Sequence, residues 1–464
     1  MPAPPIRLPL SLSPDELAPL IGAWDRPALL ESVGSGRWSI LAARPRMEFV
    51  SSDGSSYWWE SRNITIQKQS DPLPALAYLL DRFRLADSRD ATDEEGPPFQ
   101  GGMIGFLGYD LATRLERLPR RMGRDSGIPE IRFGLYDTFV VVDHQTQASE
   151  LWAVNLLDEP REKVAARADR WKADLAALPL PRGLTQLSTP RPIMSRSDYL
   201  AAARKALDYI EAGDVYQINL SQRFQAEGPV DALDLYLHLK RASPAPFAAF
   251  FGWNGSAVVG ASPETFYKTQ GDRIVTRPIK GTRPRSADPD EDRRLERELE
   301  ESIKDRAELT MIVDLERNDL GRVCRFGSVR VSEPVAVESF EQVHHLVGTV
   351  EGRLRPDVGP IDVVRAMFPG GSITGAPKIR AMEIIDELET HRRGVYTGAM
   401  GYWSRGGTSE FNIAIRTMTV EGNRVTYQVG GGIVADSTPE AEYAETLQKG
   451  LGLRRAIESC GGGR

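Results

Sequence analysis

Two side chains that could act on a substrate, Glu264 and Lys280, flank one short stretch of the 464-residue chain. Alternating apolar residues around a glycine-containing turn predict a hairpin of residues 265–269 and 273–276 between them. Pro278 should end the second strand, with Lys280 in a tight turn just after it. An acid and an amine at the ends of one hairpin can shift each other's pKa, which suits a general acid beside a lysine nucleophile. The alternative is a pair of ordinary surface charges.

Carboxylates that could hold a metal lie on two expected helices. Glu308 belongs to the helix expected over residues 302–320, and Glu442, Glu445 and Lys449 share one face of a helix that begins at residue 439. Magnesium prefers oxygen ligands and is often held by one or two carboxylates together with substrate oxygens. An i,i+4 ion pair between Glu445 and Lys449 is the simpler interpretation of the spacing alone.

Groups that could bind an anion occur in two glycine-rich turns and one strand. Residues 370–374 and 430–432 each precede an expected helix, where free backbone N–H groups bind carboxylates or phosphates; a plain tight turn is the alternative. Arg416 lies among apolar residues, where an unpaired guanidinium is costly, so a carboxylate ligand is expected for it.

Composition limits the class of protein. The chain is 41% hydrophobic and 27% charged, as in ordinary globular proteins, and its net charge of −7 argues against binding nucleic acid through counterion release. Two cysteines, Cys324 and Cys460, exclude a disulfide framework. The N-terminus lacks a signal-peptide pattern, and no apolar run could cross a bilayer. The cytoplasm is therefore the expected compartment.

The elements that position these residues predict an α+β organisation. Residues 1–155 contain short strands and helices, 156–194 a charged helix and a linker, and 195–464 most of the candidate residues. The clearest boundary is the proline-rich and polar stretch 178–192. Residues 101–110 are rich in glycine but lack the ending of a phosphate loop, so a buried strand is expected there.

Several segments together resemble the chorismate-utilising enzymes of the anthranilate synthase component I type. They are 213–220 (GDVYQINL), 262–264 (SPE), 278–282 (PIKGT), 314–322 (DLERNDLGR), 368–378 (FPGGSITGAPK), 414–417 (AIRT) and 431–437 (GGIVADS). The resemblance runs from about residue 198 to the end and extends weakly to residues 29–32. It implies an α+β fold: a large two-sheet β-sandwich with helices outside, residues 1–155 packed into the same sandwich, and the active site in the cleft between the sheets.

Within this family, two positions distinguish the possible products. Anthranilate-forming members typically carry alanine where this chain has Lys280, and isochorismate-forming members carry a water-activating lysine where it has Gln217. The chain is more similar to members that convert chorismate and ammonia into 4-amino-4-deoxychorismate, on the way to 4-aminobenzoate and folate. Anthranilate synthesis for tryptophan is the alternative. A catalytically inactive binding subunit is a third hypothesis, against which the combined presence of Glu264, Lys280, Glu308 and Glu445 argues.

The resemblance implies a role for each candidate residue. Glu264 matches the general acid that protonates the departing C4 hydroxyl, and Lys280 the nucleophile that attacks C2. Glu308, Glu445 and Glu442 match positions that bind Mg²⁺. The positions that match substrate-binding residues are Gln217, Gly281, Thr282, His345, Thr374, Tyr396, Arg416, Gly431, Gly432 and Lys449.

Two further expectations concern partners and a second ligand. Neither cysteine lies in the glycine-rich elbow of a glutaminase, so ammonia is expected from a separate glutamine amidotransferase subunit. Relatives bind tryptophan at the positions of Glu31, Ser32, Pro246 and Phe247. Here tryptophan could inhibit, serve as a structural ligand, or be absent, in which case residues 29–32 are a plain hairpin edge.

Overall fold

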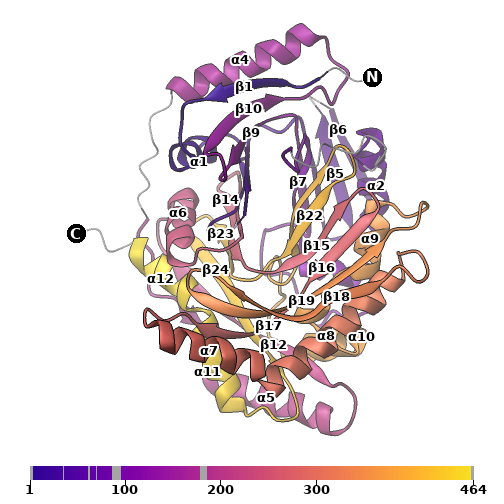
Figure 1. Ribbon diagram of the computed structural model, residues 1–464, viewed down its shortest axis with the longest axis vertical. Coiled ribbons are helices and arrows are strands. Elements are labelled where there is room, and N and C mark those ends of the chain that lie inside the picture. The colour runs from indigo at the N-terminus through magenta and orange to yellow at the C-terminus, as the bar shows by residue number, and fades with distance from the viewer. Residues whose placement is uncertain are drawn as a thin grey trace.

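The protein folds into two large antiparallel β-sheets with helices around them (Figure 1). The computed structural model describes residues 4–34, 36–60, 63–68, 71–85, 96–177 and 185–460. The predicted α+β class and two-sheet architecture are confirmed. Part of the expected boundary at 178–192, residues 178–184, lies outside the described residues.

Sheet A contains twelve of the described strands. They are β1 (Ile6–Leu10), β2 (Ala28–Glu31), β3 (Trp38–Ala42), β9 (Thr138–Asp143), β10 (Ala148–Ala153), β11 (Arg191–Pro192), β12 (Gln217–Glu227), β13 (Phe247–Trp253), β14 (Ser256–Ser262), β20 (Gly375–Ala376), β23 (Thr417–Glu421) and β24 (Arg424–Ile433). The order is β1-β10-β9-β3-β2-β13-β14-β23-β24-β12-β11, and β20 also pairs with β12.

Sheet B contains the other twelve described strands. They are β4 (Met47–Ser52), β5 (Ser55–Glu60), β6 (Asn63–Lys68), β7 (Gly102–Leu107), β8 (Ile131–Tyr136), β15 (Thr265–Gln270), β16 (Arg273–Arg277), β17 (Ile279–Pro284), β18 (Arg330–Ser339), β19 (Val343–Arg353), β21 (Ala399–Ser404) and β22 (Ser409–Ile413). The order is β17-β19-β16-β15-β22-β21-β7-β8-β4-β5-β6, and β18 also pairs with β19.

The α-helices of the described residues connect and cover these strands. They are α1 (Pro14–Gly22), α2 (Leu73–Arg82), α3 (Ala112–Leu115), α4 (Arg161–Ala177), α5 (Arg196–Glu211), α6 (Ala232–Ala242), α7 (Pro289–Glu301), α8 (Ile303–Gly321), α9 (Pro360–Met367), α10 (Lys378–Leu388), α11 (Pro439–Lys449) and α12 (Leu451–Cys460), with 3-10 turns η2 (Tyr109–Leu111) and η3 (Gly371–Ile373). None of these helices combines the length and apolar character that a membrane span requires.

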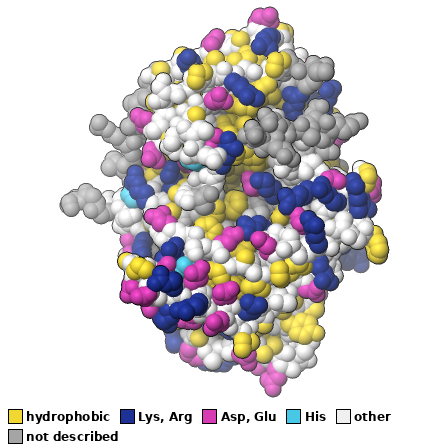
Figure 2. Space-filling view, in the orientation of Figure 1, with side chains coloured by type: hydrophobic (Ala, Val, Ile, Leu, Met, Phe, Trp, Pro, Cys, Tyr) yellow, Lys and Arg dark blue, Asp and Glu magenta, His cyan; other side chains and the backbone are white. Residues whose placement is uncertain are grey.

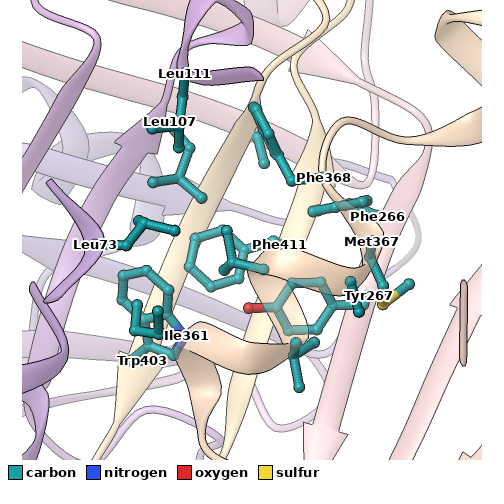
Figure 3. Packing of buried hydrophobic residues seen from close by; sticks show 14 of the residues in the cluster. Leu73, Leu107, Leu111, Phe266, Tyr267, Ile361, Met367, Phe368, Trp403 and Phe411 are labelled. Atoms are coloured by element: carbon teal, nitrogen blue, oxygen red, sulfur yellow. The ribbon is translucent and has the colours of Figure 1, made fainter. Parts of the chain in front are cut away.

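Hydrophobic packing joins the layers. Between the sheets, Phe106 of β7 lies 6.1 Å, ring centre to ring centre, from Phe251 of β13. On the other face of sheet B, helices α2, α8 and α9 cover a second cluster. Figure 3 shows Phe411 and Tyr267 of this sheet packed near Leu73 of α2 and Ile361 of α9. Figure 2 shows hydrophobic side chains gathered in a recess near the middle of one face of the molecule.

Both ends of the chain contribute strands to both sheets. In sheet A, β2 pairs with β13, and Glu31 lies opposite Ala248. In sheet B, β7 pairs with β21, and Met103 lies opposite Trp403. Residues that are hundreds of positions apart in the sequence are therefore neighbours in each sheet.

Local predictions had mixed outcomes. The hairpin around residues 270–272 is confirmed as β15 and β16, and the buried strand expected within 101–110 is β7. The tight turn at Lys280 was wrong, because Lys280 lies in strand β17, which pairs with β19. The helix expected to begin at residue 439 is confirmed as α11, and a further helix, α12, follows after Gly450.

Candidate active site

Lys280 is positioned by an irregularity in β17. The pairing of β17 with β19 shifts register between Lys280 and Thr282, as at a β-bulge. Gly281 in the bulge has φ of 71°, and a Cβ there would come within 2.8 Å of Leu299. A residue other than glycine would thus be both strained and crowded. The Lys280 ammonium donates a hydrogen bond to the Ser372 carbonyl oxygen at 3.2 Å.

The surroundings of Lys280 favour its neutral form. Burial lowers its pKa, and the nearby charge of Lys449 lowers it further, whereas Glu308, Glu264 and Glu445 act to raise it. These four groups therefore lie within electrostatic range of one amine, although they come from the segment before β15, from α8 and from α11. A lysine with a lowered pKa is easier to deprotonate and can act as a nucleophile.

Glu264 has the properties of a buried acid. Its residue is 4% exposed, and its backbone is fixed by hydrogen bonds to the Ser262 hydroxyl and from the Ile413 amide. Burial raises the pKa of its carboxyl, and the Ser372 hydroxyl and Lys280 partly oppose the rise. A carboxyl that keeps its proton to higher pH can donate that proton to a leaving group.

Two of the three proposed metal carboxylates, Glu442 and Glu445, lie beside Gly431, and Glu308 is within electrostatic range of Glu445. A Cβ at Gly431 would lie 3.0 Å from Glu442 Oε2 and 3.5 Å from Glu445 Oε1. Burial raises the pKa of Glu308, to which the charge of Glu445 also contributes. Burial acts to raise the pKa of Glu445 as well, but Lys449, 2.7 Å away, and other lysines lower it. Such mutual repulsion favours a cation between these carboxylates.

One oxygen of this group has no partner. Glu442 Oε1 accepts a hydrogen bond from Ser437 at 2.6 Å, whereas the buried Oε2 has none within the described residues. A buried unpaired carboxylate oxygen is costly unless a ligand satisfies it, so the donor set fits a hard cation. The three carboxylates nevertheless do not converge as a three-ligand cluster; the one such cluster found in the described part of the chain is Asp234, His238 and Cys460, at α6 and α12.

Arg416 and His345 form a second group of polar side chains in the candidate site. Burial lowers the pKa of Arg416, and its guanidinium has no ion pair or hydrogen bond within the described ranges. Burial and the charge of Arg416 lower the pKa of His345 to about 4, so this imidazole is neutral near pH 7. His345 Nδ1 is 2.9 Å from the Thr282 hydroxyl, whereas its buried Nε2 is unpartnered among the described residues. An unpaired guanidinium beside an unpaired imidazole nitrogen can receive an anionic substrate.

Sheet A supplies the opposite side of the candidate site. Gln217 is fully buried, and neither atom of its amide has a hydrogen-bond partner in the described structure. A Cβ at Gly432 would lie 2.4 Å from Gln217 Nε2, so glycine is needed to accommodate that side chain. Lys449 donates to the Gly430 carbonyl oxygen at 3.2 Å.

Two of the residues expected to bind substrate, Thr374 and Tyr396, make contacts away from Lys280. The Thr374 hydroxyl donates to the Gly370 carbonyl oxygen at 3.0 Å, so its proton already serves the local turn. Tyr396 is buried and lines a separate cavity together with Thr417. Thr417 directly follows Arg416, which brings this second cavity close to the candidate site.

The four residues expected to bind tryptophan line one cavity of about 420 Å³. They are Glu31, Ser32, Pro246 and Phe247. Glu31 is held by a hydrogen bond from Tyr236 and an ion pair with Lys240 at 3.0 Å. The same cavity is lined by the residues adjacent to the two candidate catalytic groups, Pro263 and Ile279.

The sequence-based selection missed some residues of the site. Ser372, whose carbonyl accepts from Lys280, lies inside the glycine-rich turn at 370–374, but nothing in the turn indicated its partner. Lys304, whose Nζ is 4.0 Å from Glu308 Oε1, follows the i,i+4 spacing and could have been found from it.

Comparison with known proteins shows which family the chain resembles. A model of the family described as chorismate binding enzyme matches residues 27–454. Aminodeoxychorismate synthase component 1 of Klebsiella aerogenes is 42% identical over 423 residues, which is 91% of each chain. Anthranilate synthase component 1 of Thermus thermophilus is 40% identical over 441 residues, covering 94% of this chain and 93% of that one.

Solved structures show the same fold. Anthranilate synthase component I from Streptococcus pneumoniae superposes with a TM-score of 0.81 at 34% identity, covering 91% of this chain and 93% of that one. The menaquinone-specific isochorismate synthase of Escherichia coli shares the fold with a TM-score of 0.75 at 19% identity, covering 98% of this chain and 95% of that one. The chain belongs to the family of chorismate-binding enzymes.

Proposed function

We propose that this chain forms 4-amino-4-deoxychorismate from chorismate and ammonia, a step toward 4-aminobenzoate and folate. The observation that carries the proposal is the partly buried amine of Lys280, with its lowered pKa, in electrostatic range of the buried acid Glu264. Similarity to relatives named aminodeoxychorismate synthase component 1, at 42% identity, supports the same reaction.

The two residues divide a difficult substitution into two displacements. Glu264 gives its proton to the C4 hydroxyl, which leaves as water while neutral Lys280 bonds to C2 and the ring double bonds shift. Ammonia then bonds to C4, the double bonds shift back, and the lysine leaves C2. The surplus proton of the amine passes to solvent or to a carboxylate, so the net change replaces hydroxyl by amino and releases water.

Glu308, Glu442 and Glu445 are the residues that would hold a magnesium ion. When bound, the ion would supply positive charge against the ring carboxylate of chorismate. The chain itself supplies Arg416, Lys449 and the backbone N–H groups of Gly431 and Gly432 for the substrate's carboxylates. Gln217 has no basic group, so it can hold a polar substrate atom but cannot activate water.

A separate glutamine amidotransferase subunit is proposed as the ammonia source. The "component 1" in the relatives' names supports a multi-subunit enzyme. Burial raises the pKa of Cys324 to about 11 and that of Cys460 to about 12, which makes both thiols poor nucleophiles. Neither cysteine is therefore suited to release ammonia from glutamine.

The cavity at Glu31, Ser32, Pro246 and Phe247 is proposed to bind tryptophan. Its volume, its aromatic and aliphatic lining and the fixed Glu31 carboxylate suit an amino acid with a large apolar side chain. This cavity and the 40% identity to an anthranilate synthase component 1 favour anthranilate synthesis as the second candidate function.

Product analysis of the purified chain tests the proposal. With chorismate, Mg²⁺ and ammonium, mass spectrometry should detect 4-amino-4-deoxychorismate. Lys280→Ala should lower its rate of formation by about a hundredfold or more, since the covalent route is lost. Lys205→Ala removes a lysine of α5 that is exposed and paired with Glu387, and it should keep the native rate. Anthranilate and pyruvate from the native chain would establish the second candidate instead.

A further inference from the structure

Helices α6 and α12 bring together three side chains that the proposed reaction does not use. Helix α12 lies beside α6 in Figure 1, and their apolar faces belong to one core cluster. A Cβ on Gly452, near the start of α12, would lie 3.0 Å from the Cβ of Ser243, which caps the end of α6. At the other end of this contact, Cys460 of α12 meets Asp234 and His238 of α6. The two helices are therefore antiparallel, and the end of α12 lies against the first half of α6.

The three side chains offer an oxygen, a nitrogen and a sulfur at distances suited to one metal ion. One ligand atom of each lies within 4.8 Å of the other two. Tetrahedral Zn²⁺ holds its ligand atoms roughly 3.3–3.8 Å apart, because its bonds to oxygen, nitrogen and sulfur are about 2.0–2.3 Å long. The side chains of Asp234 and His238 are 23% and 25% exposed, so neither is fixed by close packing on all sides. Small side-chain rotations therefore suffice to close the set around an ion.

The His238 imidazole is held in a form that can bind a metal. Its Nδ1 lies 2.9 Å from the backbone carbonyl oxygen of Asp234, which can only accept, so Nδ1 carries the proton. In the neutral ring the lone pair is then on Nε2, which is the proposed ligand atom. A histidine that binds a metal usually donates its other ring N–H to a carboxylate or a backbone carbonyl in this way.

The thiol of Cys460 makes its hydrogen bond within its own helix. Its Sγ donates to the Ala456 carbonyl oxygen at 3.1 Å. Burial, followed by the negative charge of Asp234, raises the pKa of Cys460 to about 12, so the thiolate is disfavoured beside that carboxylate. A divalent cation between the two groups reverses this effect, because a thiol that binds a metal is deprotonated. The thiol proton then passes to solvent.

The mixed donor set selects the kind of ion. Thiolate and imidazole ligands favour Zn²⁺ and similar ions, whereas Mg²⁺ prefers oxygen ligands. Three protein ligands leave the fourth position of a tetrahedral ion to water. The cluster therefore differs in chemistry from Glu308, Glu442 and Glu445, which offer only oxygen.

We propose that Asp234, His238 and Cys460 bind a zinc ion that joins α12 to α6. An ion held by two helices binds the folded chain more tightly than the unfolded one, so it adds to the free energy of unfolding. Helix α6 also carries the side chains that hold Glu31, so the ion stabilises one wall of the proposed tryptophan cavity. The inference does not depend on which product the enzyme forms from chorismate.

Titration with Co²⁺ tests the site, because Co²⁺ takes the place of Zn²⁺ and a thiolate bound to it gives a charge-transfer absorption band. The full chain is freed of metal with a chelator, kept reduced, and titrated in excess Mg²⁺, which occupies sites made of oxygen ligands. The thiolate band should saturate at one ion per chain, and Zn²⁺ should abolish it. Cys460→Ala should lose the band, and His238→Gln and Asp234→Asn should each weaken Co²⁺ binding about tenfold or more. Cys324→Ala, which changes the buried cysteine outside the cluster, is the matched control and should keep the band.

Melting temperatures give a second measurement. Zn²⁺ should raise the melting temperature of the native chain but not that of Cys460→Ala. The absence of a thiolate band in the native chain would overturn the inference, as would a band that survives in Cys460→Ala. Unchanged Co²⁺ affinity in both His238→Gln and Asp234→Asn would reject the three-residue site. The melting temperature without metal identifies any variant that fails to fold, and the native chain and the remaining variants then decide.

Discussion

At the scale of single residues, Arg416 shows how an unsatisfied charge marks a binding position. Its backbone has φ of 49°, an uncommon value for a residue other than glycine. Burial lowers the pKa of its guanidinium, and no described carboxylate pairs with it. The free energy cost of this arrangement is recovered if a substrate carboxylate binds there.

Arg416→Lys should therefore weaken chorismate binding. A lysine keeps the charge but loses the planar pair of donors, so the KM for chorismate should rise about tenfold or more with a smaller change in kcat. Steady-state kinetics at saturating ammonium measures both constants. Arg273→Lys is the matched control, because Arg273 is half-exposed and already paired with Glu351 at 2.7 Å. Equal KM values for the two variants would argue against Arg416 as a carboxylate ligand.

At the scale of elements, helix α8 is connected by a buried contact to β16, the strand that precedes the one with Lys280. The Thr276 hydroxyl, at the end of β16, donates a hydrogen bond to Glu316 of α8. The same helix carries Glu308, two turns earlier, and β17 with Lys280 follows β16 directly. The contact fixes the helix and the strand relative to each other and so helps to place a carboxylate near the amine.

The protonation of Glu316 gives a prediction for stability. Burial raises its pKa from 4.5 to about 8, so the folded state binds its proton more tightly than the unfolded state. The stability that this tighter proton binding gives the folded state is fully present below about pH 4.5 and is lost as the pH rises toward 8. Glu316→Gln, which cannot ionise, should be more stable than the native chain at pH 9, by about 2 kcal/mol or more, but not at pH 5. Urea unfolding at the two pH values measures this.

The control for that experiment is Glu300→Gln, which changes an exposed carboxylate of α7. It should leave the pH dependence of the free energy of unfolding as in the native chain. A Glu316→Gln variant whose stability follows the native pH dependence would show that Glu316 is already ionised in the folded protein.

Local elements were predictable where the signal lay within a few residues. The hairpin of β15 and β16 follows from alternation and its turn, and the N-cap of α8 from Ser302, whose side chain accepts from the Asp305 amide. Strand β17 was misinterpreted as a turn, because Pro278 and Gly281 are turn residues in isolation. Its strand character comes from pairing with β19, more than sixty residues later, which no local pattern shows.

The candidate site was predictable to a different degree. Residue types and spacing pointed to Glu264 and Lys280 as a pair. The role of Glu308 and Glu445 near that pair came from family resemblance, since spacing equally allowed a surface ion pair between Glu445 and Lys449. The buried pair of Glu389 and Arg393 gave no sequence signal, because charged residues four apart on or near a helix are usually solvent-exposed.

At the scale of the whole molecule, the two ends of the chain depend on each other. Strands from residues 1–155 form part of each sheet, and the inter-sheet cluster includes Phe139 from this part and Phe251 from the later part. We predict that residues 195–464 expressed alone do not fold into a stable unit, because both sheets lose strands and expose apolar faces. Circular dichroism and urea unfolding of the fragment should show no cooperative transition, whereas the full chain shows one.

A cooperative transition in the fragment would instead identify residues 195–464 as an independent domain. Adding residues 1–155 as a separate chain is the matching experiment. If the sheets require both parts, mixing the two fragments should restore the transition and the ammonium-dependent activity.

The pairing of β7 with β21 also has a consequence during synthesis. Met103 leaves the ribosome long before Trp403, the residue opposite which it finally lies. At about 5–20 residues per second, the edge of β7 that β21 will occupy stays open for a time on the order of tens of seconds. An unpaired edge of an apolar strand is a site at which nascent chains can aggregate. Newly made chains should therefore need chaperone protection more than the folded enzyme does. Expression at a low growth temperature should improve the yield of soluble protein.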